Sequence, residues 1–141
     1  MIVAALHVAA ARKAPMEAVE RIELVAGQGV VGDRYFGTRS RHVSVQSLEE
    51  LAEAAERRGA PVPAGDTRRT VTVDSGRVPT TPGALLRLGD VELEVVRKAA
   101  PCRVMESGVG PGAARAMHER GGAICRVLTS GVVRVGDPVS W

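Results

Sequence analysis

Cys102 is the residue of this sequence best placed to do chemistry, because Pro101 precedes it and Arg103 follows it. Proline favours the first turn of a helix, since its φ angle is fixed and it has no N–H group to pair. A cysteine in such a turn lies near unpaired backbone N–H groups that stabilise an anion. A stabilised thiolate suits a sulfur nucleophile, a persulfide carrier or a metal ligand. A buried structural cysteine is the alternative interpretation, because free cysteines are among the most buried residues.

The second cysteine and the histidines add no further catalytic pattern. Cys125 lies in a strand-like run and is expected in the core, although its pairing with Cys102 stays open. Without a secretion signal, two cysteines are more naturally thiols than a disulfide framework. His7, His42 and His118 lie far apart and show no metal-ligand spacing, so no zinc site is predicted. A Cys–His hydrolase would need the fold to bring Cys102 beside His42 or His118.

Three arginines are candidates for binding an anion. Arg68 and Arg69 precede a predicted strand, where two guanidinium groups can hold a phosphate through charge-assisted hydrogen bonds. Adjacent strand residues face opposite ways, so only one of the pair is expected to point at a ligand. Arg34 ends a glycine-rich loop, residues 27–34, in which Asp33 would brace the turn while Arg34 points into a site. Solvated arginines and a purely structural turn are the alternatives.

The glycine-rich loop at residues 27–34 is not a nucleotide-binding fingerprint. It lacks the Lys-Ser/Thr ending of a P-loop, and no helix is predicted after it.

Short runs rich in β-branched residues and separated by Gly, Pro or Asp predict a mostly β fold. Eight candidate strands at short spacing favour a β-barrel, and the Gly89-Asp90 pair predicts a tight hairpin turn. Ser130-Gly131 is a second candidate turn. The candidate strands are residues 2–9, 16–25, 41–45, 70–74, 84–88, 91–96, 123–128 and 132–139.

Two helices are expected beside the strands. Ser47 stands three residues before Glu50, which predicts a capping box at the start of a helix that ends at Gly59. Residues 111–120, followed by two glycines, predict a second and shorter helix.

The composition sets limits on the class of protein. A chain of 141 residues fits one domain, residues 1–141, with a core of aliphatic side chains because aromatic residues make up only 2%. The net charge is +3, but acids and bases alternate without a long basic run, so nucleic-acid binding is not predicted. No segment is long and apolar enough for a membrane span or a signal peptide. A cytoplasmic protein is therefore expected.

Several segments, taken in order, resemble the MOSC domain, a family named for the C-terminal domain of molybdenum cofactor sulfurases. The resemblance spans nearly the whole chain and implies a mostly β barrel, closed or partly open, of the pyruvate-kinase-barrel type. The matching segments are residues 29–34 (GVVGDR), 41–45 (RHVSV), 68–73 (RRTVTV), 101–102 (PC), 121–123 (GGA) and 131–137 (GVVRVGD).

The resemblance also implies roles for individual residues. Cys102 matches the family cysteine that carries sulfur or ligates molybdenum, and Arg68 and Arg69 match a basic pair that grips the pterin phosphate. Arg126 falls near a weaker cofactor contact. Two positions depart from the pattern: Thr70 stands where many members have Asn, and Tyr35 stands where His is frequent. The predicted cofactor-binding residues are Arg34, His42, Arg68, Arg69, Thr70 and Arg126.

Three functions are consistent with this pattern. The first is a molybdenum-cofactor reductase of small N-hydroxylated compounds, with Cys102 as the metal ligand and an electron-donor protein as partner. The second is a sulfur carrier that receives persulfide sulfur on Cys102 from a separate cysteine desulfurase. The pyridoxal phosphate would then belong to the partner, because no desulfurase domain is recognised here. The third is a non-catalytic cofactor-binding module.

Overall fold

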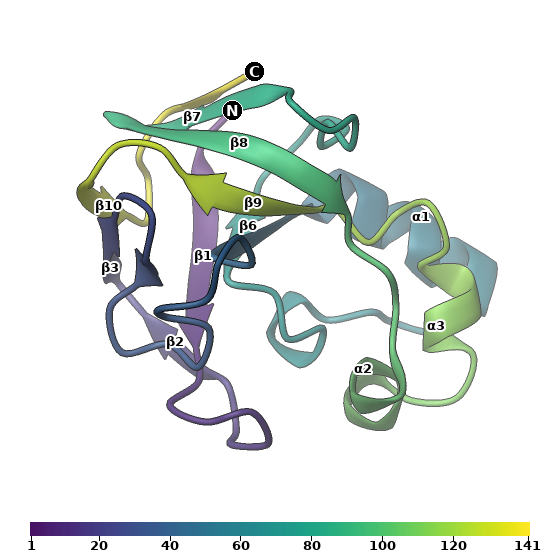
Figure 1. Cartoon of the computed structure of the whole chain (residues 1–141). Coiled ribbons are helices and arrows are strands. Elements are labelled where there is room, and N and C mark those ends of the chain that lie inside the picture. The colour runs from purple at the N-terminus through teal and green to yellow at the C-terminus, as the bar shows by residue number, and fades with distance from the viewer.

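The computed structural model describes residues 1–141 and consists mostly of short strands (Figure 1). One sheet has eight strands in the order β11-β7-β8-β9-β5-β6-β1-β2, and a smaller sheet has the order β10-β3-β4. The strands are β1 (Val3–Val8), β2 (Glu17–Val19), β3 (Arg21–Val25), β4 (Gly29–Val30), β5 (Val43–Ser47), β6 (Val71–Val73), β7 (Leu85–Leu88), β8 (Val91–Lys98), β9 (Ala123–Val127), β10 (Gly131–Arg134) and β11 (Val139–Ser140).

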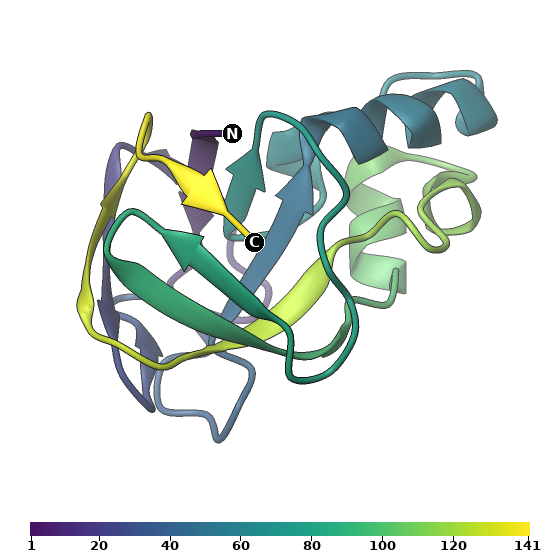
Figure 2. The same ribbon diagram turned by 90° about the horizontal axis from the view of Figure 1, so that it is seen from above.

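The large sheet curls strongly, so that the chain around β11 returns to the start of β1 and a barrel forms (Figure 2). The amide of Val3 donates to the carbonyl of Asp137 and the amide of Val139 donates to the carbonyl of Met1, both at 2.9 Å. Twenty buried side chains fill the interior, and none of them is aromatic. The predicted mostly β barrel with an aliphatic core is confirmed.

Helix α1 (Leu48–Arg58) begins and ends where the sequence predicts. The Ser47 hydroxyl accepts from the amide of Glu49 at 3.1 Å, and Gly59 ends the helix in the left-handed conformation. The capping box is only half formed, however. The Glu50 carboxylate accepts from the amide of Val78 at 2.9 Å, so it ties the helix to a distant loop.

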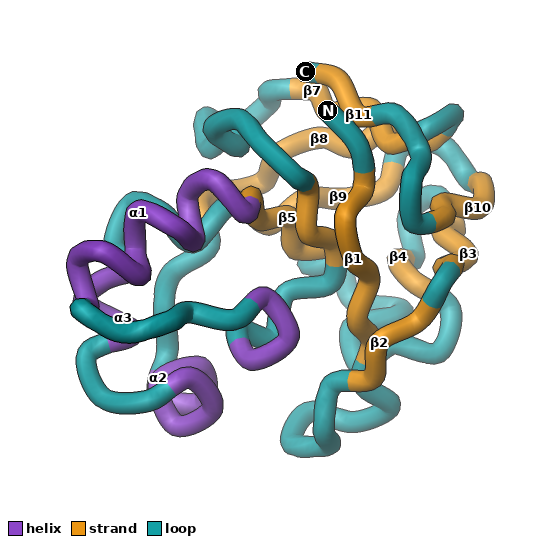
Figure 3. Tube along the Cα trace, turned by 180° about the vertical axis from the view of Figure 1, so that it is seen from behind, coloured by secondary structure: helices purple, strands orange, loops and turns teal.

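A helical lobe lies on one side of the barrel (Figure 3). It contains α1, the 3₁₀ turn η1 (Ala64–Asp66), α2 (Arg103–Val109) and α3 (Ala113–Ala116), packed around their own apolar cluster. The second predicted helix, residues 111–120, is shortened to α3, which follows Gly112 with its positive φ of 86°, and Glu119 with a positive φ of 65° prevents the helix from continuing to residue 120. None of the helices has the length and apolar character needed to cross a bilayer.

Two predicted strands are each divided between the sheets. Residues 16–25 form β2, which pairs with β1, and β3, which pairs with β10. Residues 132–139 likewise form β10 and β11, separated by a turn at which the amide of Asp137 donates to the carbonyl of Arg134. Strand β4 lies inside the predicted loop 27–34, where it pairs with β3. Tertiary pairing decided the break between β2 and β3, since the hydrophobic pattern runs through residues 16–25. Between β10 and β11 the break is local, because Gly136, Asp137 and Pro138 interrupt the pattern and Gly136 has a positive φ of 95°.

Candidate functional site

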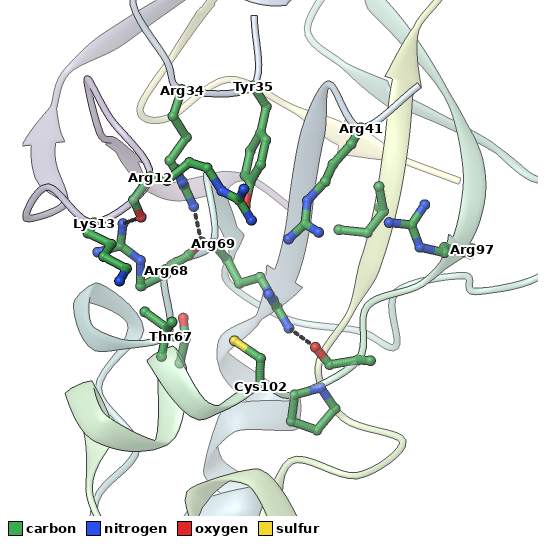
Figure 4. Close-up of a pocket in the computed structure, with 14 residues that line it drawn as sticks. Arg12, Lys13, Arg34, Tyr35, Arg41, Thr67, Arg68, Arg69, Arg97 and Cys102 are labelled. Carbon is green, nitrogen blue, oxygen red and sulfur yellow. Dashed lines mark hydrogen bonds between the residues drawn. The ribbon is translucent and has the colours of Figure 1, made fainter. Parts of the chain in front are cut away.

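A cavity of about 660 Å³ opens between the barrel and the start of α2 (Figure 4). Half of its fourteen lining residues are basic and none is acidic. Such a lining favours an anionic ligand, because the fields of neighbouring positive charges add within a concave site. The basic residues are Arg12, Lys13, Arg34, Arg41, Arg68, Arg69 and Arg97.

Cys102 lines this cavity with an exposed, free thiol. The sequence predicts a helical turn opened by Pro101, but helix α2 begins later, at Arg103. Cys102 is its extended N-cap residue, with φ −135° and ψ 171°, and its side chain makes no capping hydrogen bond. Figure 4 shows the sulfur atom directed toward the guanidinium of Arg69. The thiol is therefore accessible both to a ligand in the cavity and to a partner from outside.

Arg69 is buried, with only 4% of its surface exposed. Its Nε donates to the carbonyl of Gly121 at 3.1 Å and its Nη2 to the carbonyl of Ala100 at 3.3 Å. Burial lowers the pKa of Arg69 to about 10, and the proximity of Cys102 opposes this effect. The guanidinium thus stays charged at neutral pH and is held rigidly beside Cys102.

Arg68 lines the same cavity as Arg69, although strand alternation predicts that only one of the two would. The reason is local: Arg68 has a positive φ of 62°, and β6 begins only at Val71. Its guanidinium donates to the carbonyls of Arg12 and Ala14, both at 2.9 Å. Burial lowers the pKa of Arg68, with the neighbouring Arg34 contributing in the same direction.

The loop after β4 contributes Arg34 to the lining of the cavity. Its Nη1 donates to the Asp33 carboxylate at 3.0 Å and its Nη2 to the carbonyl of Arg68 at 3.1 Å. Asp33 also accepts from the amides of Ala9 and Tyr35, so one buried carboxylate braces the whole turn. The structure places Asp33 beneath the loop and Arg34 in the cavity lining.

Tyr35 and Arg41 complete the upper part of the cavity. The guanidinium carbons of Arg34 and Arg41 lie 4.5 and 4.4 Å from the centre of the Tyr35 ring. These are cation–π distances, so the phenol ring fixes both cations. The Nε of Arg41 is buried and has no hydrogen-bond partner.

Sequence reasoning missed Arg12, Lys13, Arg41 and Arg97 as cavity residues. They are basic residues from three separate segments; Arg41 begins the family-like segment 41–45, in which His42 is instead the residue predicted to bind the cofactor, and the other three belong to no motif. For Arg12, Lys13 and Arg97 the sequence offers its excess of basic over acidic side chains, which indicates no position.

Three predicted cofactor-binding residues do not line the cavity. The buried His42 ring accepts from the amide of Val127 through Nδ1 and donates from Nε2 to the carbonyl of Thr38, so both ring nitrogens are occupied. Thr70 is buried, and its amide donates to the Ser44 hydroxyl at 2.9 Å. Arg126 points outward from β9 and pairs with Glu94. His42 and Thr70 thus hold neighbouring segments of the barrel together, and Arg126 lies at the surface.

Cys125 lies in the barrel core and is a free thiol, as is Cys102. Burial raises the pKa of the Cys125 thiol to about 12, so it stays protonated at neutral pH. The two cysteines are not paired in this structure.

Comparison with known proteins agrees with this fold. The chain is similar to the YuaD protein from Bacillus subtilis, with a TM-score of 0.83 and 20% identity, covering 97% of this chain and 92% of that one. YiiM from Geobacillus stearothermophilus gives a TM-score of 0.73 with 16% identity, covering 98% of this chain and 73% of that one. For YiiM from Escherichia coli the TM-score is 0.71 with 17% identity, covering 99% and 69%. No curated protein sequence matches the chain.

The family comparison is more specific than these likenesses of fold. Residues 32–140 match the MOSC domain, and this range contains Cys102 and five of the seven basic residues of the cavity. It also contains every strand from β5 onward. This chain therefore belongs to the MOSC domain family.

Proposed function

We propose that this protein binds the molybdenum cofactor in its basic cavity and uses Cys102 as the protein ligand of the metal. MOSC domains bind this cofactor in related proteins. The observation that carries the proposal is the composition of the cavity, in which seven basic side chains and no acidic one surround an exposed thiol.

The residues present fit such a ligand. The terminal phosphate of the molybdenum cofactor matches guanidinium groups, which bind phosphate oxygens through charge-assisted hydrogen bonds. Arg68 and Arg69 are already fixed by backbone carbonyls, so binding would cost little side-chain entropy. A cavity of about 660 Å³ is also within the usual size of small-molecule sites.

The absence of a complete protein site for a metal ion also fits this cofactor. No three His, Cys, Asp or Glu side chains gather to hold a metal ion by themselves. A metal at Cys102 would have to bring its other ligands with it, as a pterin dithiolene does, and a soft thiolate suits that metal. The bound cofactor would supply the redox chemistry. The protein would hold the phosphate, present the Cys102 sulfur and leave the cavity open to a small molecule.

The reaction proposed for this site is the reduction of small N-hydroxylated compounds. It removes the hydroxyl oxygen as water and consumes two electrons and two protons. A separate electron-donor protein would supply the electrons.

The test is metal and pterin analysis of protein purified from a molybdate-fed host. Wild type is compared with Cys102→Ser and Arg69→Gln, and Arg126→Gln is the matched control because Arg126 lies outside the cavity. We expect molybdenum and pterin in wild type and in the control, loss of molybdenum from Cys102→Ser, and loss of both from Arg69→Gln. Wild type without molybdenum or pterin would contradict the proposal.

The exposure of Cys102 favours a second candidate, sulfur transfer. A carrier thiol must reach the active site of another protein, and Cys102 is exposed whereas Cys125 is buried. The Cys102 thiolate would attack the terminal sulfur of a desulfurase persulfide. A new S–S bond forms on Cys102 as the donor's S–S bond breaks, and the donor cysteine leaves as a thiolate.

Whole-protein mass spectrometry tests this candidate. Wild type and Cys102→Ser are incubated with a pyridoxal-phosphate-dependent cysteine desulfurase and cysteine. Sulfur transfer requires that wild type gain the mass of one sulfur atom, that dithiothreitol remove it, and that the variant gain none. An unchanged wild-type mass would exclude this role with the desulfurase used.

A further inference from the structure

The basic side chains of the cavity differ in what they contact. Arg34, Arg68 and Arg69 donate to backbone carbonyls, which hold them in place. Four other basic residues line the same cavity but form no ion pair and no side-chain hydrogen bond with the protein: Arg12, Lys13, Arg41 and Arg97. These four side chains therefore keep their hydrogen-bonding capacity for something that enters the cavity.

Arg41 and Arg97 also share one end of the cavity. Figure 4 shows them on the side opposite Arg68 and Lys13, with Arg69 between the two sides. Arg41 is fixed against Tyr35 at 4.4 Å, and Arg97 extends from the end of β8, the strand that leads to Cys102. We refer to Arg41 and Arg97 as the Arg41–Arg97 end.

We infer that the Arg41–Arg97 end binds an anionic group of the substrate, so that the reduced compound is an N-hydroxylated molecule that carries a carboxylate or a phosphate. This inference rests on the proposed function, because it assigns the cofactor's own phosphate to the opposite end of the cavity. It names the class of substrate for the same site.

Arg41 and Arg97 leave positive charge in the cavity unmatched. The buried Nε of Arg41 has lost its hydration without gaining an acceptor, which is unfavourable for a donor on a charged group. One cofactor phosphate carries at most two negative charges and cannot neutralise the six basic side chains that remain after Arg34 pairs with Asp33. A neutral substrate would leave Arg41 and Arg97 without an anion, whereas an anionic one would pair with both and place its other end near Cys102.

The test measures anion binding beside Cys102 without any cofactor. Metal-free protein is alkylated with iodoacetate, which is an anion, and with iodoacetamide, which has the same reactive carbon but no charge. The ratio of the two rates at Cys102 is compared with the ratio for the urea-unfolded chain. Because both reagents attack the same sulfur, the ratio cancels changes in the reactivity of the thiol itself.

We expect the folded wild type to prefer iodoacetate, relative to the unfolded chain, by at least about tenfold, and the preference to weaken as salt is added. Arg41→Gln and Arg97→Gln should each lower it roughly tenfold, the usual effect of one hydrogen bond to a charged group. Arg97 is exposed, so its replacement leaves the fold intact. Arg126→Gln, outside the cavity, should keep the wild-type ratio.

The inference holds if both variants lose the preference and retain the cofactor content of wild type. It is overturned if wild type shows no preference, or if either variant keeps it. It is also overturned if either variant loses pterin, since that arginine would then hold the cofactor's phosphate. If wild type contains no cofactor, the proposed function fails, yet the alkylation ratio still decides whether this end binds an anion.

Discussion

At the scale of single residues, the two cysteines show how surroundings decide chemistry. Cys102 is exposed at the rim of a basic cavity, whereas Cys125 is packed among aliphatic side chains in the barrel. A cysteine thiol is therefore accessible to ligands at position 102 and inaccessible at position 125.

We predict that native alkylation labels Cys102 alone. Burial raises the pKa of Cys125 to about 12, which keeps this thiol protonated and unreactive while the protein is folded. N-ethylmaleimide in native buffer should add one label to wild type and none to Cys102→Ser, as seen by intact-mass measurement. In guanidinium chloride each protein should gain one more label. A labelled Cys102→Ser under native conditions would show that Cys125 is accessible.

A second prediction concerns Glu50, whose pKa is raised by burial above its ordinary value of 4.5. A carboxyl with a raised folded pKa contributes full stability below its unfolded pKa and loses that contribution as the pH rises through the folded pKa. Glu50→Gln should therefore raise the free energy of unfolding at pH 7, because the amide oxygen still accepts from Val78. The gain should shrink toward pH 4.5, as measured by urea denaturation.

The control for Glu50 is Glu56→Gln, which changes an exposed residue of the same helix. It should alter stability little across this pH range. Equal effects of the two substitutions at every pH would contradict the role given to burial.

At the scale of elements, the cavity is made where strands and helices begin or end. Arg69 precedes β6, Arg97 lies near the end of β8, and Cys102 caps α2. Gly122 precedes β9 in this region, and its φ is +82°. A β-carbon at this position would overlap the carbonyl oxygen of Val45.

Gly122→Ala should therefore lower the free energy of unfolding by on the order of 3 kcal/mol or more, the range of a severe steric clash. Gly136→Ala is the matched control, because Gly136 has a similar φ of +95° but a β-carbon there would meet no atom within 4 Å. It should lose only about 1–2 kcal/mol for the left-handed conformation. Thermal and urea unfolding of both variants measure the difference, and similar losses would rule out the clash with Val45.

At the scale of the whole molecule, seven basic side chains surround one cavity, and only Arg34 is paired with a carboxylate, so the others repel one another when no anion is present. A ligand that binds only the folded state stabilises it by mass action. Tripolyphosphate at about 100 times its dissociation constant should therefore raise the unfolding temperature by roughly 10 °C. Sodium chloride at the same ionic strength should not reproduce the rise. A rise that persists unchanged in Arg69→Gln would place the binding elsewhere.

The features that could be predicted from the amino-acid sequence are those that depend on near neighbours. Short runs of β-branched residues between Gly, Pro and Asp indicated the mostly β barrel, Ser47 and Gly59 marked the bounds of α1, and six segments in their order along the chain indicated the family. The strand and helix signals are local, because capping, turn formation and strand composition act over a few residues. The family signal lies instead in the order of short segments along the chain.

Which side chains share the cavity depended instead on the tertiary structure. Folding brought Arg12, Arg41 and Arg97 to Cys102 from separate segments, and it placed His42 and Arg126 elsewhere. The physical reason is that strand pairing and sheet curvature set the position of a side chain relative to distant parts of the chain. The positive φ of Arg68 is a further case, since it overrides the alternation that its neighbours in sequence suggest.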